Sequence, residues 1–172
     1  MAHWLPRLIK HRLLDDGDAR RALGAEALAR IETRVAASEA RHSGQIRVCV
    51  EAGLPLSYLT RHASARDRAV AMFGKLRVWD TAHNNGVLIY LLLAERAIEI
   101  VADRGIAAHV DAGEWTAITA QMEGAFRGGE FAAGLYRAID AVDALLVQHF
   151  PRIAGAAAGD YPNELPDAPV VR

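Results

Sequence analysis

The sequence predicts an α/β domain whose small mixed β-sheet, with one parallel crossover and an antiparallel hairpin over residues 86–103, is flanked by helices on both faces. Three observations support this fold class. Residues 45–51 alternate apolar and polar side chains, as a half-buried strand does. Residues 87–93 are continuously apolar, which indicates a strand that is covered on both faces. A charged turn at Glu95 and Arg96 then leads into the second arm of a hairpin.

Apolar side chains at helical spacing predict four helices, over residues 22–41, 64–76, 113–126 and 130–149. The helix over 64–76 separates the first strand from the hairpin, so the strands on either side of it should be parallel and joined by a right-handed crossover. Gly128 and Gly129 separate the last two helices, and Pro151 follows the last one. Because the run over 87–93 has no polar side, helices should cover both faces of the sheet.

The first 20 residues form an amphipathic segment ahead of the domain, which we expect to span residues 21–152. The apolar residues of this segment recur at near-helical spacing among basic ones: Trp4, Leu5, Leu8 and Ile9. Such a segment can pack its apolar face on the core of its own domain. It can also make peripheral contact with a membrane surface through the same four side chains. The sequence leaves both interpretations open.

The end of the chain, residues 153–172, is rich in Pro, Ala and Gly, and it holds three of the six prolines. Few of its side chains are large and apolar. The segment therefore buries too little surface to offset the entropy lost when a backbone becomes ordered. We expect residues 153–172 to form a flexible tail.

The composition argues against several classes of protein. The formal net charge is −1, so no global field would attract nucleic acid. Cys49 is the only cysteine, which excludes an intrachain disulfide and a thiolate metal site. No apolar run reaches the ~20 residues of a membrane span, and residues 1–14 lack the features of a signal peptide. We therefore expect a cytoplasmic protein, with membrane association left open and any protein partner unidentified.

The hairpin brings two polar segments together. Antiparallel pairing around a turn near Glu95 places Gly86 opposite residues 103–104, so the loop before Gly86 meets this segment at the open end of the hairpin. Four oxygen-bearing side chains fall there: Asp80, Asn84, Asn85 and Asp103. Carboxylate and amide oxygens are the ligands that Ca²⁺ and Mg²⁺ prefer, so these four residues form a candidate metal site. Each also has a structural alternative in a turn or a helix cap.

Signatures of common catalytic sites are absent from the sequence. It contains no HExxH, GxSxG, P-loop or GxGxxG pattern. His83 lies in the polar loop and could act as a ligand or a proton donor, or remain solvated. His109 and Asp111 follow the hairpin and could extend the open end. Glu114 is placed to favour the N-terminus of the helix over 113–126.

The hairpin and its surroundings resemble the TPM domain family, over about residues 28–150. The resemblance begins at Asp80 and the Asn84–Tyr90 segment and continues through the Glu95-Arg96 turn to Gly105. It extends to further positions in the last two helices: Trp115, Met122, Glu123, Phe126, Gly129, Phe131 and Gly134. This family contains a plant thylakoid-lumen acid phosphatase, a photosystem repair protein, a nematode acetylcholine-receptor modulator and many bacterial proteins.

The resemblance implies a mixed sheet flanked by helices, the divalent-metal binding reported for some members, and the acid phosphatase activity claimed for the plant branch. Two hypotheses follow. The first is a divalent-metal-binding or partner-binding module that is linked to membrane-protein maintenance, with Ca²⁺ or Mg²⁺ at the open end. The alternative is a metal-dependent acid phosphatase acting on phosphomonoesters, in which Asp80 and Asp103 hold an ion that polarises a phosphoryl oxygen.

Overall fold

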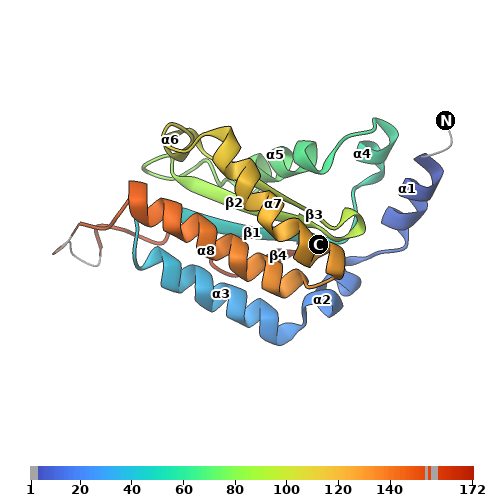
Figure 1. The fold of residues 1–172 in the computed structure, drawn as a ribbon, viewed down its shortest axis with the longest axis horizontal. Helices are drawn as coiled ribbons and strands as arrows, with labels where there is room; N and C mark the ends of the chain where they lie inside the picture. Colours follow the sequence, from blue (N-terminus) through green and yellow to red (C-terminus); the bar gives the residue numbers. More distant parts are fainter. Residues whose placement is uncertain (1–3, 154, 156–158) are drawn as a thin grey trace.

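A four-stranded mixed β-sheet forms the centre of the computed structural model, which describes residues 4–153, 155 and 159–172 (Figure 1). The strands lie in the spatial order β3-β2-β1-β4 and comprise β1 (Gln45–Glu51), β2 (Gly86–Leu92), β3 (Ala97–Ala102) and β4 (Val170–Val171). β1 runs parallel to both β2 and β4, whereas β2 and β3 pair antiparallel. The predicted parallel crossover and hairpin are therefore confirmed.

Helices surround the sheet. Those of the described residues are α1 (Trp4–Arg12), α2 (Asp16–Leu23), α3 (Ala25–Glu39), α4 (Leu56–Thr60), α5 (Ala65–Lys75), α6 (Arg104–Ala107), α7 (Ala112–Gly128) and α8 (Phe131–His149), with a 3-10 turn η1 (Leu93–Glu95). The helices predicted over 64–76, 113–126 and 130–149 correspond to α5, α7 and α8. The helix predicted over 22–41 begins instead at Ala25, because Gly24 adopts a φ of 80° and separates α2 from α3.

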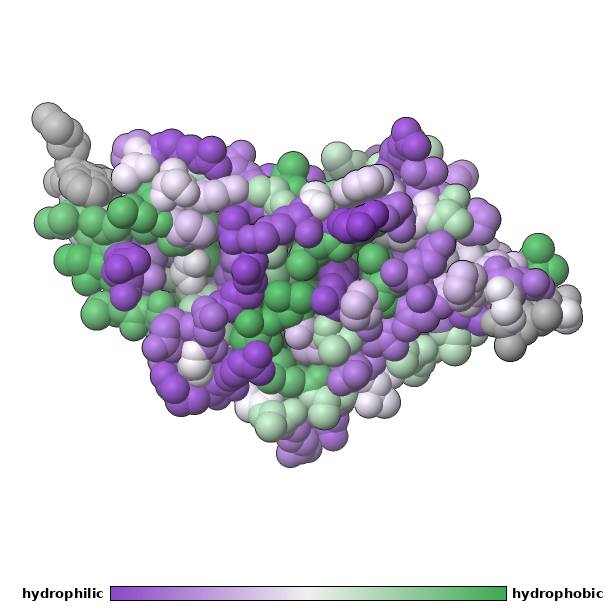
Figure 2. All heavy atoms as spheres, turned by 180° about the vertical axis from the view of Figure 1, so that it is seen from behind, coloured by the Kyte–Doolittle hydropathy of each residue, from purple (hydrophilic) through white to green (hydrophobic). Residues whose placement is uncertain are grey.

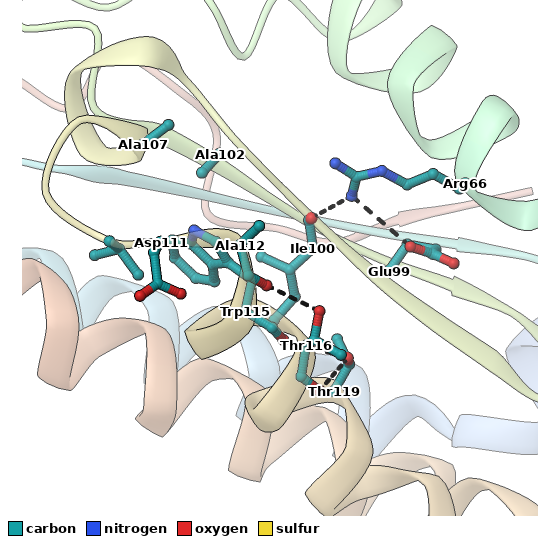
Figure 3. A pocket seen from close by; sticks show the side chains of 11 residues that line it. Arg66, Glu99, Ile100, Ala102, Ala107, Asp111, Ala112, Trp115, Thr116 and Thr119 are labelled. Carbon is teal, nitrogen blue, oxygen red and sulfur yellow. Dashed lines mark hydrogen bonds and ion pairs between the residues drawn. The ribbon is translucent and has the colours of Figure 1, made fainter.

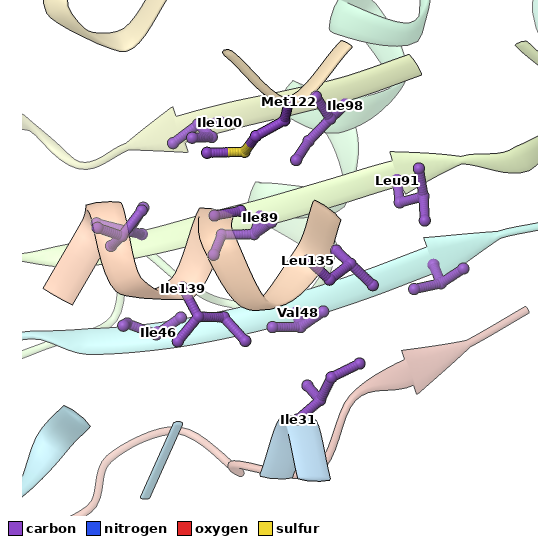
Figure 4. Packing of buried hydrophobic residues seen from close by; sticks show 14 of the residues in the cluster. Ile31, Ile46, Val48, Ile89, Leu91, Ile98, Ile100, Met122, Leu135 and Ile139 are labelled. Carbon is purple, nitrogen blue, oxygen red and sulfur yellow. The ribbon is translucent and has the colours of Figure 1, made fainter. Parts of the chain in front are cut away.

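Helices cover both faces of the sheet, as predicted. On one face, α3, α7 and α8 pack over the sheet, and Ile89, Leu135 and Ile139 are fully buried between them (Figure 4). On the other face, α5 packs through Met72 over the alternate side chains of the sheet, among them Leu88 and Tyr90. Every residue of β1 and β2 is buried. Each fully buried aliphatic side chain stabilises the fold by roughly 1.5–3 kcal/mol.

From residue 159 onward the chain differs from the flexible tail predicted for residues 153–172, whereas residues 154 and 156–158 of that prediction lie outside the described residues. β4 pairs with the outer edge of β1, and Leu165 is buried. Arg47 Nη1 donates a hydrogen bond to the carbonyl of Ala168, and Gln45 Oε1 accepts one from the N–H of Leu165 at 3.0 Å. The predicted flexibility rested only on the small apolar surface that the segment can bury. Polar side chains of β1 instead hold its backbone in place.

The N-terminal helix α1 docks on the domain beside the hairpin turn. Arg7 Nε donates to Glu95 Oε1 at 2.7 Å, and His11 Nε2 lies 3.0 Å from the same oxygen. Leu8 packs against the core on the α5 side of the sheet. The amphipathic segment therefore packs in part on its own domain, and the side chain of Trp4 lies outside what the structure describes. No described helix is long and apolar enough to cross a membrane.

Candidate functional site

The open end of the hairpin brings the loop before β2 against the residues after β3, as predicted. The N–H of Asp103 donates to the carbonyl of Gly86 at 2.9 Å. The N–H of Gly105 donates to the carbonyl of Asn84 at 2.8 Å. The antiparallel β2–β3 register continues this pairing along the hairpin. Two polar segments about 20 residues apart in the sequence are thus fixed side by side by backbone hydrogen bonds.

Two of the four predicted ligands carry a buried oxygen that has no hydrogen-bond partner among the described residues. Asn85 is fully buried, and its Nδ2 donates to Ser43 Oγ at 3.3 Å, while its Oδ1 meets no donor. Asp103 is the N-cap of α6 and accepts from the N–H of Arg104 at Oδ1 (2.7 Å), while its buried Oδ2 meets no donor. Buried polar atoms are nearly always paired in native proteins. Each of these two oxygens is therefore a candidate ligand atom.

The other two predicted ligands are engaged by arginines. Asp80 is about half exposed, and its Oδ2 accepts from Arg77 Nη2 at 2.6 Å. Asn84 adopts a φ of 52°, and its Oδ1 accepts from Arg104 Nε at 3.1 Å. The four predicted residues therefore do not present four free oxygens. Nor do any three His, Cys, Asp or Glu side chains in the described part of the chain gather as a potential metal site.

Glycine is required at two points of the open end because backbone segments approach each other closely. A Cβ atom on Gly86 would lie 2.0 Å from the carbonyl oxygen of Val78. A Cβ atom on Gly105 would lie 2.5 Å and 2.6 Å from the carbonyl oxygens of Asn84 and His83. These distances are far below van der Waals contact, so a side chain would force the segments apart. Loop carbonyl oxygens thus lie against the residues that follow β3.

The remaining polar residues that the sequence analysis singled out have structural roles or are exposed. The ring of His109 stacks on that of His149, with centroids 5.3 Å apart. Asp111 and Glu114 form the capping box of α7, in which each side chain accepts a hydrogen bond from the other residue's N–H. His83 is exposed. The expected role of Glu114 at a helix N-terminus is confirmed.

A buried ionic cluster at the carboxyl end of β1 was missed by sequence reasoning. Arg68 donates two hydrogen bonds to the carboxylate of Glu51, at 2.7 and 2.5 Å, and Tyr90 Oη donates a third at 2.8 Å. The bonds to Glu51 raise the pKa of Arg68, and burial raises the pKa of Tyr90. One sequence signal could have found the cluster: Arg68 lies on the apolar stripe of its helix, beside Ala65 and Ala69. The three bonds from Arg68 and Tyr90 satisfy the Glu51 carboxylate, so we assign the cluster a structural role.

Comparison with solved structures places this fold among known ones. The BA42 protein from the psychrophilic bacterium Bizionia argentinensis, determined by NMR, is 28% identical, with a TM-score of 0.72 over 86% of this chain and 94% of that one. The N-terminal domain of a protein from P. gingivalis is 20% identical, with a TM-score of 0.60 over 81% of this chain and 94% of that one, which shows a shared fold.

Comparison with sequences defines the family. No curated protein matches the chain significantly. The family model described as the TPM domain matches residues 18–145. This range includes the whole hairpin, its open end, α3, α5 and α7, and most of α8. The chain therefore belongs to the TPM domain family.

Proposed function

We propose that the chain is a divalent-cation-binding module that holds Ca²⁺ or Mg²⁺ at the open end of the hairpin. One observation carries this proposal: the buried, unpartnered oxygens Oδ1 of Asn85 and Oδ2 of Asp103. A carboxylate and an amide oxygen match the oxygen ligands that these ions take in proteins. A bound cation would also offset the cost of burying a carboxylate oxygen that meets no donor.

A site with one buried carboxylate should be weak. Arg104 lies beside it, with Nε 3.1 Å from Asn84 Oδ1, and its charge opposes a cation. Asp80 would add a second carboxylate only by leaving Arg77, and an exposed ion pair of this kind contributes about 0–1 kcal/mol. We therefore expect a dissociation constant on the order of 10⁻⁴–10⁻³ M, which is the weak end of the range for protein calcium sites.

A Ca²⁺ titration of the full chain, followed by thermal unfolding, tests the proposal, with Mg²⁺ in parallel. At about ten times the dissociation constant, the ion should stabilise the fold by ~1.4 kcal/mol. Asp103→Asn keeps a residue that can cap α6 and should remove the response. Asp111→Asn is the matched control, because Asp111 caps α7 and has no orphan oxygen. The site is refuted if Asp103→Asn responds like the unmodified chain, or if neither responds.

A metal-dependent acid phosphatase acting on phosphomonoesters is the second candidate. It is favoured by Arg104, an exposed cation beside the candidate metal site that could bind a phosphoryl oxygen. Cys49 is not available as a nucleophile, since burial raises the pKa of its thiol to about 12. Hydrolysis of p-nitrophenyl phosphate that requires Mg²⁺ or Ca²⁺, and is lost in both Arg104→Ala and Asp103→Asn, would favour the enzyme. Stabilisation by the ion without turnover would favour the binding module.

We also propose that the outer face of α1 makes a peripheral membrane contact, in keeping with a role in membrane-protein maintenance. Leu5 and Ile9 of α1, and Leu13 just after it, are spaced by four residues and are 53%, 50% and 75% exposed. Hydrophobic residues gather at the end of the molecule where α1 lies (Figure 2). The basic residues Lys10 and Arg12 of the same helix are also exposed, as on helices that bind anionic lipid surfaces. Leu8, which the sequence placed in the same contact, packs inward.

Sedimentation with vesicles of phosphatidylcholine and phosphatidylserine tests this contact. The double variant Leu5→Glu, Ile9→Glu should lose binding, because two exposed apolar side chains are replaced by charges that anionic lipid repels. Val70→Glu is the matched control, since Val70 is 51% exposed on α5 instead. Equal sedimentation of all three proteins, or none of the unmodified chain, would argue against a membrane role for α1.

A further inference from the structure

A groove runs along the free edge of β3, between α5 and α7 (Figure 3). One hollow of this groove has a volume of about 490 Å³ and is lined by Ile100 and Ala102 of β3, by Trp115 and Thr116 of α7, and by Arg66 of α5. A second hollow of about 480 Å³ shares Thr116 and continues towards the hairpin turn. The two hollows together follow the length of one strand.

The edge of β3 presents backbone groups to this groove. The hydrogen bond from Asp103 to Gly86 and the antiparallel register turn the backbone groups of alternate residues, Ile98, Ile100 and Ala102, away from β2. Within the described residues, Arg66 Nη1 donates to the outward carbonyl of Ile100, and the three outward N–H groups meet no acceptor. An unpaired strand edge is a template for another strand.

Trp115 provides a second, independent indication that the groove is made for a ligand. Its side chain lines the groove, and its Nε1 is buried without an acceptor among the described residues. A buried indole N–H normally has a hydrogen-bond partner. A carbonyl oxygen of a ligand that displaces the atoms covering Nε1 would supply one.

We propose that this groove binds an extended segment of a partner protein, which adds to the sheet as a strand beside β3. Outward backbone groups recur every second residue, about 6.6–6.8 Å apart, and an extended chain matches that spacing with its own donors and acceptors. On the opposite side of the sheet, a short segment from the end of the chain already adds to β1 in this way, as β4. This proposal concerns a surface separate from the candidate metal site.

The lining of the groove indicates the chemistry of the segment. Its charged residues are largely paired with each other: Arg66 Nη1 lies 3.7 Å from Glu99 Oε2, and Arg127 pairs with Glu123. On the α7 side, Trp115 and Ala112 lie beside Thr116 and Thr119, whose hydroxyls donate to carbonyls of their own helix. The segment should therefore be uncharged, with apolar side chains at alternate positions facing α7. A second copy of this chain is disfavoured, because its own α5 and α7 would flank the incoming strand edge.

Selection from a displayed library of random seven-residue peptides on the folded full chain tests the proposal. Enriched peptides should alternate apolar and polar residues, and a synthetic copy should slow the hydrogen exchange of the Ile98, Ile100 and Ala102 amides. Ala102→Pro removes one outward N–H and no bond to β2, and Thr116→Trp fills the groove. Each should weaken binding about tenfold or more.

Thr33→Trp is the matched control, because Thr33 is likewise an exposed helical threonine bonded to the carbonyl four residues earlier, but on α3. It should bind the peptide like the unmodified chain, and the melting temperatures of all variants establish that they fold. The proposal is overturned if no peptide is enriched, or if the peptide binds Ala102→Pro and Thr116→Trp undiminished. It is also overturned in favour of self-association if the chain alone sediments as a dimer that Ala102→Pro abolishes.

Discussion

At the scale of single residues, Glu39 is a carboxyl group buried at the end of α3. Its Oε1 accepts a hydrogen bond from the N–H of Ile46 at 2.7 Å, and burial raises its pKa to about 8 from 4.5. The folded chain therefore holds a proton that the unfolded chain releases above pH 4.5. Stability contributed by Glu39 is fully present below that pH and is lost as the pH rises to about 8.

Glu39→Gln removes this titration and keeps an oxygen for Ile46. The free energy of unfolding of the unmodified chain should fall between pH 4.5 and 8 by on the order of 3–5 kcal/mol relative to the variant. Urea unfolding at intervals of pH measures the difference. Glu32→Gln, on the exposed part of the same helix, should leave the pH dependence unchanged. Parallel pH profiles for the unmodified chain and Glu39→Gln would contradict the assignment.

His42 should act in the opposite direction. Its ring is fully buried, Nδ1 donates to the carbonyl of Gly44, and burial lowers its pKa to about 4 from 6.5. The unfolded chain gains a proton near pH 6.5 and the folded chain does not, so stability should fall by on the order of 1–3 kcal/mol as the pH drops from 6.5 to 4. Because Glu39 opposes this slope, His42→Gln is best compared in the Glu39→Gln background. A slope that survives the change would assign it to another group.

The cluster of Glu51, Arg68 and Tyr90 should be sensitive to which partner is removed. Tyr90→Phe leaves the carboxylate with both bonds from Arg68 and should cost about 1–2 kcal/mol of unfolding free energy. Arg68→Ala leaves a buried charge without its counter-ion and should cost about 3–5 kcal/mol. Urea unfolding at pH 7 measures both values. Arg61→Ala, an exposed arginine on the same side, should change little; an Arg68→Ala cost no larger than that of Tyr90→Phe would contradict the ionic role.

At the scale of elements, β4 depends on side chains of β1. Arg47 donates to the carbonyls of Pro166 and Ala168, and the backbone of Arg172 pairs with Val50 and Ala52. Arg47→Ala should therefore release the end of the chain, with hydrogen exchange over residues 164–172 accelerating about tenfold or more while β2 stays protected. Exchange measured by mass spectrometry tests this. Arg41→Ala, which removes an exposed arginine that follows α3 and pairs with Asp143, should leave the segment protected.

The sequence could predict β1, the hairpin and three of the long helices because their patterns are local. Alternation over 45–51 and the apolar run over 87–93 need no knowledge of what packs on them. β4 is different, since it is ordered by hydrogen bonds from residues more than 100 positions earlier. A search for apolar surface cannot detect such polar contacts.

The candidate site was predicted in part for a similar reason. Hairpin register alone places Asp103 beside Gly86, and the structure has that bond. The register does not predict that Arg77, three residues before Asp80, pairs with its carboxylate. Nor does it predict the hydrogen bond from Arg104 to Asn84. Side-chain contacts between residues three positions apart, and between the two loops, determine which oxygens of the open end remain without a partner. The sequence therefore predicted which two segments meet at the open end, but not which of their oxygens are engaged by arginines.

At the scale of the whole molecule, the two ends of the hairpin differ in their polar contacts. The open end holds the orphan oxygens of Asn85 and Asp103, whereas the turn end holds Glu95, to which α1 docks through Arg7 and His11. The N–H of Leu54 donates to Nδ1 of His11, so the proton of the neutral ring lies on Nε2, facing Glu95. The two ends are about 20 Å apart at ~3.3 Å per residue of strand.

This separation predicts that the ends act independently. Glu95→Ala removes the acceptor of both Arg7 and His11 and should cost about 1–2 kcal/mol, with faster trypsin cleavage after Arg12 as α1 undocks. Its response to Ca²⁺ should equal that of the unmodified chain, and its cost should add to that of Asp103→Asn within about 0.5 kcal/mol. Urea unfolding of the two single variants and the double variant measures the coupling. A larger coupling would mean that a change at one end of β2 and β3 alters the stability of the other end. Docking of α1 and cation binding at the open end would then affect each other.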